Sequence, residues 1–109
     1  MGRDRRRYPR VGVALDISVE AAGRRWDVKT VDLSPYGVKV ALPASAIRPS
    51  EGTSVKLQLT VPDSADPLSI KSMVWRREPK STVLIFIELG REQLERLKDL
   101  VELLQTAPA

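Results

Sequence analysis

Hydrophobic and polar side chains alternate with a period of two over most of the chain, in short runs separated by turn residues. Such alternation is typical of β-strands with one buried face. Six runs fit this description, and the strands that they predict cover residues 11–20, 25–33, 38–42, 55–61, 68–75 and 82–89. The last run is apolar on both faces, which favours a central position in a sheet.

Turn residues separate the predicted strands. Gly23 marks the first turn, and the tetrapeptide Ser-Pro-Tyr-Gly at residues 34–37 has the residue order of a type I turn. Loops containing proline, serine and threonine are expected over residues 43–53 and 62–67.

The C-terminal segment has the period of an amphipathic helix. Leu94, Leu97, Val101 and Leu104 recur at helical spacing, and the predicted helix covers about residues 91–105. Its apolar stripe either covers the chain's own β-structure or pairs with another chain. Six short strands and one helix in 109 residues predict a single domain, built as a small antiparallel barrel or sandwich.

No cysteine and no histidine occurs in the chain. Their absence excludes disulfides, thiolate nucleophiles, Cys/His metal sites and an imidazole general base. Nothing resembles a base-activated nucleophile or a metal cluster, so we expect neither an enzyme nor a cofactor. No apolar run is long enough for a signal peptide or a membrane span, so we expect a cytoplasmic protein without membrane contact.

The positive charge of the chain is concentrated at its N-terminus. The first ten residues hold five arginines and one aspartate, whereas the remainder holds 13 basic and 13 acidic side chains. Residues 1–10 have no apolar pattern and repel one another, so we expect a flexible arm followed by a folded domain at 11–109. The basic residues of this arm are arginines rather than lysines, and a planar guanidinium fork can grip phosphate bidentately and can also stack on a base.

Two short motifs follow one another in the N-terminal half. Arg6 and Arg10 form an R-x-x-x-R pattern, and Asp32, Ser34 and Gly37 form a D-x-S-x-x-G pattern at the second turn. Each motif alone occurs in many proteins. In this order, and in a domain of this length, they resemble the PilZ family of bacterial cyclic di-GMP receptors, which the later strands and the terminal helix also fit.

The resemblance implies a mainly β fold, a six-stranded antiparallel β-barrel with a C-terminal α-helix. It also implies that the five motif residues bind cyclic di-GMP. An arginine fork matches the O6 and N7 acceptors of guanine, and the carboxylate of Asp32 can accept the N1–H and N2 donors of its other edge. Ser34 can reach a phosphate or a base, and Gly37 allows a tight turn and close approach of the ligand.

Three further residues are candidates for the same site. Arg5 stands immediately before the first motif, where an arginine in this family is associated with two stacked, intercalated cyclic di-GMP molecules. We therefore expect two ligands per chain. Arg7 adds positive charge, and Trp75 lies on the strand face opposite Val74, where it either borders the ligand or belongs to the core.

These inferences predict a receptor that binds cyclic di-GMP and relays the signal, through ordering of the arm, to an unidentified effector protein in trans. One alternative is a PilZ-like adaptor that binds protein without nucleotide. A basic β-barrel that binds nucleic acid is a further alternative, disfavoured because only five aromatic residues exist as stacking platforms. A purely structural role of Ser34 in pinning the turn stays open. The arm alone would also fit a nonspecific tether to nucleic acid or an acidic membrane.

Overall fold

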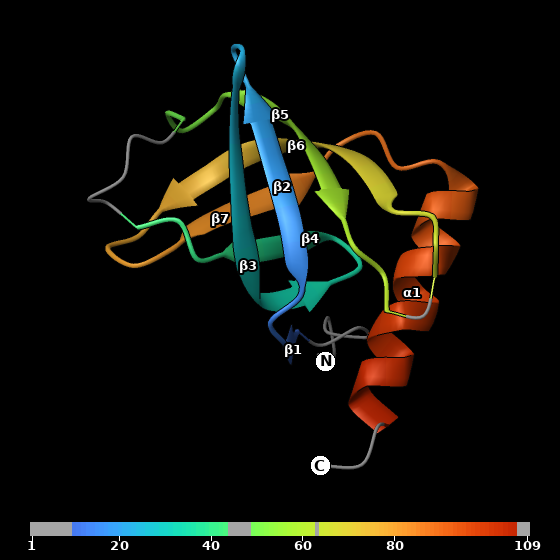
Figure 1. Cartoon of the computed structure of the whole chain (residues 1–109). Coiled ribbons are helices and arrows are strands. Elements are labelled where there is room, and N and C mark those ends of the chain that lie inside the picture. The colour runs from blue at the N-terminus through green and yellow to red at the C-terminus, as the bar shows by residue number, and fades with distance from the viewer. Residues whose placement is uncertain (1–9, 44–48, 63, 107–109) are drawn as a thin grey trace, which may run out of the picture.

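The computed structural model describes residues 10–43, 49–62 and 64–106. Its elements in chain order are β1 (Val11–Gly12), β2 (Asp16–Ala21), β3 (Arg24–Ser34), β4 (Gly37–Val40), β5 (Ser54–Leu59), β6 (Leu68–Arg77), β7 (Thr82–Phe86) and α1 (Arg91–Thr106). Figure 1 shows strands that curve round on one another, with α1 standing beside them. The fold is mainly β.

Six of the strands close into a ring. Each pairs antiparallel with the next in the order β3, β2, β5, β6, β7 and β4, and β4 pairs back onto β3. The two-residue strand β1 pairs with β3 beyond the end of β2. The prediction of a six-stranded antiparallel barrel with a C-terminal helix is confirmed.

The predicted first strand, residues 11–20, is in fact two strands, because the chain leaves the regular ladder between β1 and β2. The side chain of Thr30 on β3 bonds to this interruption. Its hydroxyl accepts a hydrogen bond from the amide of Leu15 at 2.8 Å and donates one to the carbonyl of Val13. Beyond this interruption β1 pairs with β3. The pairing also positions Arg10, which comes directly before β1.

The hairpin between β2 and β3 turns through only two residues, Ala22 and Gly23, since Ala21 pairs directly with Arg24. Both turn residues have positive φ, at 52° for Ala22 and 78° for Gly23. Two-residue hairpins whose twist matches their strands need this conformation, which glycine adopts freely. The turn predicted at Gly23 is confirmed.

The barrel has an apolar interior against which α1 packs. Its largest fully buried strand side chains are Leu33, Leu57, Leu59, Ile70 and Leu84. From α1, Leu97, Leu100 and Val101 join the same core, and the helix contacts β1 and β3. The apolar stripe of the helix therefore covers the chain's own barrel, the first of the two alternatives that the sequence allows.

One polar side chain inside this core has an unpaired hydroxyl. Ser72, in the middle of β6, is fully buried, and its Oγ has no hydrogen-bond partner among the described residues. A buried hydroxyl without a partner costs about 1–3 kcal/mol of stability. Ser72 is therefore a weak point of the core.

Candidate functional site

Ser34 holds together the turn between β3 and β4. Its hydroxyl accepts hydrogen bonds from the amides of Tyr36 at 3.1 Å and Gly37 at 3.2 Å, and donates a longer one of 3.4 Å to the carbonyl of Gly37. The residue is buried. Ser34 thus has the turn-pinning role that the sequence leaves open, and a ligand contact would have to share the same hydroxyl.

Gly37 is required by the backbone of a neighbouring strand. A Cβ atom at this position would lie 2.7 Å from the carbonyl oxygen of Leu84 on β7. The φ angle of Gly37 is not positive, so the turn itself does not call for glycine here. From the sequence, Gly37 is expected to allow the tight turn and the close approach of a ligand. The structure gives a different reason, the close packing of β4 on β7, and ligand approach stays a prediction.

Arg10 and Asp32 connect the two motifs. Pairing of β1 with β3 sets Gly12 opposite Asp32, so Arg10 is delivered to the same edge of the barrel. The Arg10 Nε donates to Asp32 Oδ1 at 2.8 Å, and Nη2 lies 2.6 Å from the same oxygen. The Arg10 side chain is 44% exposed and the Asp32 side chain 21%. A ligand can therefore reach both groups.

The strand register brings further side chains to the outer surface that carries Asp32. Directly paired residues of antiparallel strands point to the same side of a sheet. Asp32 pairs with Lys39 on β4, Lys39 with Val83 on β7, and Val83 with Arg76 on β6. These four positions define what we call the motif face, the part of the outer surface of β3, β4, β7 and β6 that immediately surrounds Asp32, Lys39, Val83 and Arg76.

A β-bulge in β6 adds Trp75 to the motif face. The pairing of β6 with β7 shifts between Val74 and Arg76, so Trp75 is the extra residue between two successive pairs. Trp75 is 56% exposed, whereas Val74 is buried in the barrel. The prediction that Trp75 lies opposite Val74 is confirmed, and the alternative that it belongs to the core is wrong.

Glu78, just beyond β6, binds two cations of the motif face. Its Oε1 lies 3.2 Å from Lys39 Nζ and accepts a hydrogen bond of 3.0 Å from the Ser81 hydroxyl. Its Oε2 lies 3.1 Å from Arg76. The pKa of Glu78 is held below its ordinary value by hydrogen bonds. The largest effect comes from Lys39, the next from Ser81, and a smaller one from Arg76. Sequence reasoning missed Lys39 and Glu78, because only the strand register brings them together.

A comparison with protein-family models matches residues 4–103 to the family described as PilZ domain. The chain belongs to the PilZ family. The matched range contains both motifs and every strand of the barrel.

Solved PilZ structures share this fold. The PilZ domain of CeSA from a cellulose-synthesizing bacterium has a TM-score of 0.72 and 20% identity, covering 89% of this chain and 98% of that one. The PilZ domain of YcgR from Escherichia coli, with c-di-GMP, has a TM-score of 0.70 and 16% identity, covering 94% and 92%.

A longer protein is also similar. The Bacillus subtilis inhibitor of motility (MotI/DgrA) has a TM-score of 0.78 and 20% identity, covering 94% of this chain. The PilZ chain described here spans only 51% of MotI. Identities this low show a common fold and nothing finer. A search of curated protein sequences finds no match to this chain.

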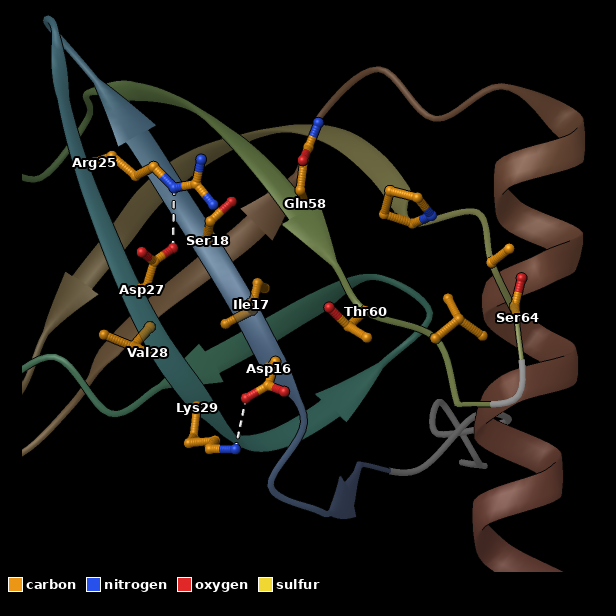
Figure 2. A pocket seen from close by; sticks show the side chains of 13 residues that line it. Asp16, Ile17, Ser18, Arg25, Asp27, Val28, Lys29, Gln58, Thr60 and Ser64 are labelled. Carbon is orange, nitrogen blue, oxygen red and sulfur yellow. Dashed lines mark hydrogen bonds and ion pairs between the residues drawn. The ribbon is translucent and has the colours of Figure 1, made fainter.

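A hollow of about 520 Å³ lies on another part of the PilZ barrel, lined by outward residues of β2, β3 and β5 and by the loop after β5. Figure 2 shows its charged side chains paired with one another: Asp16 with Lys29 at 2.5 Å, and Arg25 with Asp27 at 2.9 Å. The charges of the described lining residues, Asp16, Arg25, Asp27 and Lys29, therefore cancel. None of the motif residues that the structure describes lines it, so we do not choose it as the candidate site for a phosphate ligand.

Arg5, Arg6 and Arg7 lie outside the described residues, together with the rest of the predicted arm up to residue 9.

Within the described ranges, no group of His, Cys, Asp and Glu side chains could hold a metal ion. None of the helices found there is long and apolar enough to cross a membrane. The candidate site, as far as the structure describes it, consists of Arg10, Asp32, the turn at Ser34 to Gly37, and Trp75.

Proposed function

We propose that this PilZ domain is a cyclic di-GMP receptor that binds its ligand on the motif face. The ion pair between Arg10 and Asp32 carries the proposal, because it joins one residue of each motif at that surface. Family membership supports it, as does the common fold with the YcgR domain, which was solved with c-di-GMP. The proposed activity is binding, without catalysis.

Asp32 has the acceptor capacity that guanine recognition needs. Among the described residues only Arg10 bonds to this carboxylate, and it uses Oδ1 alone. Oδ2 is therefore available to the N1–H and N2 donors of a guanine. The partly exposed guanidinium of Arg10 has further N–H groups, which can donate to a phosphate or to the O6 and N7 atoms of a base.

The remaining contacts come from both sides of this ion pair. The exposed ring of Trp75 offers a flat surface on which a guanine can stack. Arg6 would complete the first motif, with Arg5 and Arg7 adding charge. Two stacked ligands bring four phosphate charges that repel one another, so we propose that Arg5 supports a second ligand molecule.

Signal relay follows from the position of the first motif. Arg10 is already at the motif face, and the arginines that precede it are drawn toward the ligand phosphates. Binding would then fix the arm across the face and form a new surface for an effector protein in trans.

A PilZ-like adaptor that binds protein without nucleotide is the second candidate. It is favoured by the exposure of two aromatic side chains, Tyr36 at 55% and Trp75 at 56%. Exposed aromatic residues are common anchors of protein interfaces. In this case the ion pair of Arg10 with Asp32 and the hydroxyl of Ser34 would serve the fold alone.

Isothermal titration calorimetry with cyclic di-GMP and with GMP at moderate salt separates the two candidates. A receptor should bind cyclic di-GMP far more tightly than GMP, which has one base and cannot span the site. Asp32→Ala should abolish this preference and leave the unfolding transition in place. Equal curves for the two nucleotides, or no heat with either, would refute the receptor and favour the adaptor.

A further inference from the structure

Charged side chains alternate in sign across the motif face. Arg10 is bound by Asp32, the adjacent Lys39 is bound by Glu78, and Glu78 also binds Arg76. Asp32 belongs to a motif and has a role in the proposed site. Glu78 belongs to no motif, yet it is a negative charge on a surface that would receive phosphates.

The pair of Lys39 and Glu78 is more enclosed than two other lysine–carboxylate pairs of the barrel, Lys29 with Asp16 and Lys71 with Glu88. Its side chains are 28% and 27% exposed, against 61% and 65% for Lys29 with Asp16. The pair of Lys71 with Glu88 is similarly open, at 62% and 67%. Partly enclosed charges are screened less by water and salt, so Glu78 interacts more strongly with a nearby anion than a surface carboxylate does.

The position of Lys39 makes this interaction relevant to the ligand. Lys39 stands directly opposite Asp32 in the register, and Arg76 follows Trp75 in the bulge. A ligand whose guanine is bound by Asp32 would bring its phosphates within reach of the Lys39 ammonium. Those phosphates and the carboxylate of Glu78 would then compete for the same cations.

We propose that Glu78 is a built-in competitor of the ligand phosphates: it holds Lys39 and Arg76 in the free protein and yields them to the phosphates on binding. Lys39 and Arg76 are then further phosphate-binding residues of the site, and Glu78 sets its affinity. The inference rests on the proposed function, since it assumes an anionic ligand on the motif face. It predicts that the carboxylate weakens binding of the intact protein.

The test is the substitution Glu78→Gln, which removes the negative charge and keeps an oxygen that can accept from Ser81. Because Lys39 and Arg76 would then have no competing carboxylate, the affinity for cyclic di-GMP should rise about two- to fivefold. Glu88→Gln is the matched control, because it makes the same charge change beside Lys71 at 3.1 Å, away from the motif face. It should leave the affinity unchanged.

Lysine substitutions form the second arm of the test. Lys39→Met should weaken binding roughly five- to tenfold and remove part of the gain caused by Glu78→Gln, as expected for groups that act on each other. Lys71→Met should do neither. Thermal unfolding of each variant shows that the fold is intact.

Inorganic pyrophosphate serves as a second probe, followed by amide chemical shifts, because it carries phosphate charge without guanine. If cyclic di-GMP failed to bind but Glu78→Gln still tightened pyrophosphate binding, the receptor proposal would fall and the role of Glu78 would stand. If Glu78→Gln weakened binding of both probes, or changed it no more than Glu88→Gln does, the inference would be overturned.

Discussion

Replacing Arg10 with lysine should weaken cyclic di-GMP binding nearly as much as replacing it with alanine. Arg10 directs two nitrogens, at 2.8 and 2.6 Å, to one oxygen of Asp32, whereas a lysine has a single nitrogen. Lysine therefore keeps at most one of these contacts and has no planar fork for the ligand. Loss of a charge-assisted hydrogen bond is worth about 1.5–3 kcal/mol, or roughly ten- to a hundredfold in affinity. The 44% exposure of Arg10 places the expected loss toward the lower end.

Calorimetry of the wild type, Arg10→Lys and Arg10→Ala measures this effect. Arg96→Lys is the control, because Arg96 lies on α1 and its guanidinium donates to the carbonyl of Asp66 at 3.0 Å. It should bind the ligand like the wild type. Wild-type affinity in Arg10→Lys would show that Arg10 acts as a point charge, and the geometry proposed for it would be wrong.

Three other substitutions test separate parts of the account. Gly37→Ala should cost about 1–3 kcal/mol in urea unfolding, because the new methyl group would meet the Leu84 carbonyl at 2.7 Å; an unchanged midpoint would disprove the proposed reason for this glycine. Ser72→Ala should raise stability by about 1 kcal/mol, seen as a higher Tm, since it removes an unpaired buried hydroxyl; a lower Tm would mean that the hydroxyl is satisfied. Arg5→Ala should reduce the calorimetric stoichiometry from two ligands per chain toward one, and a wild-type value of one would refute the stacked pair.

The regular parts of the fold could be predicted because their signals are local. Alternation along β5 and the helical spacing of Leu97 and Val101 depend only on neighbouring residues, and both elements are present. The interruption between β1 and β2 was missed because it depends on the side chain of Thr30, on another strand. The alternation of apolar and polar residues continues through this interruption, so the pattern alone predicts a single strand.

The residues of the candidate site likewise fall into those that could be predicted from the sequence and those that could not. The motif residues could be found from their spacing, whereas the place of Trp75 opposite Val74 left open whether its side chain is exposed, as the structure shows, or part of the core. The reason for Gly37 could not be found, because the contacting atom belongs to Leu84 on another strand. The contact of Lys39 with Glu78 depends on the register of β4, β7 and β6 and on the bulge in β6. Neither feature can be predicted from one segment of the sequence alone.

The most direct test of the central claim is a titration of isotope-labelled protein with cyclic di-GMP, followed by backbone amide and tryptophan indole signals. Binding on the motif face predicts large shifts at Asp32, Lys39 and the indole of Trp75. Ser18 and Gln58, which line the hollow in Figure 2, should not move. Shifts confined to the hollow, or none at saturating ligand, would contradict the assignment of the motif face as the cyclic di-GMP site.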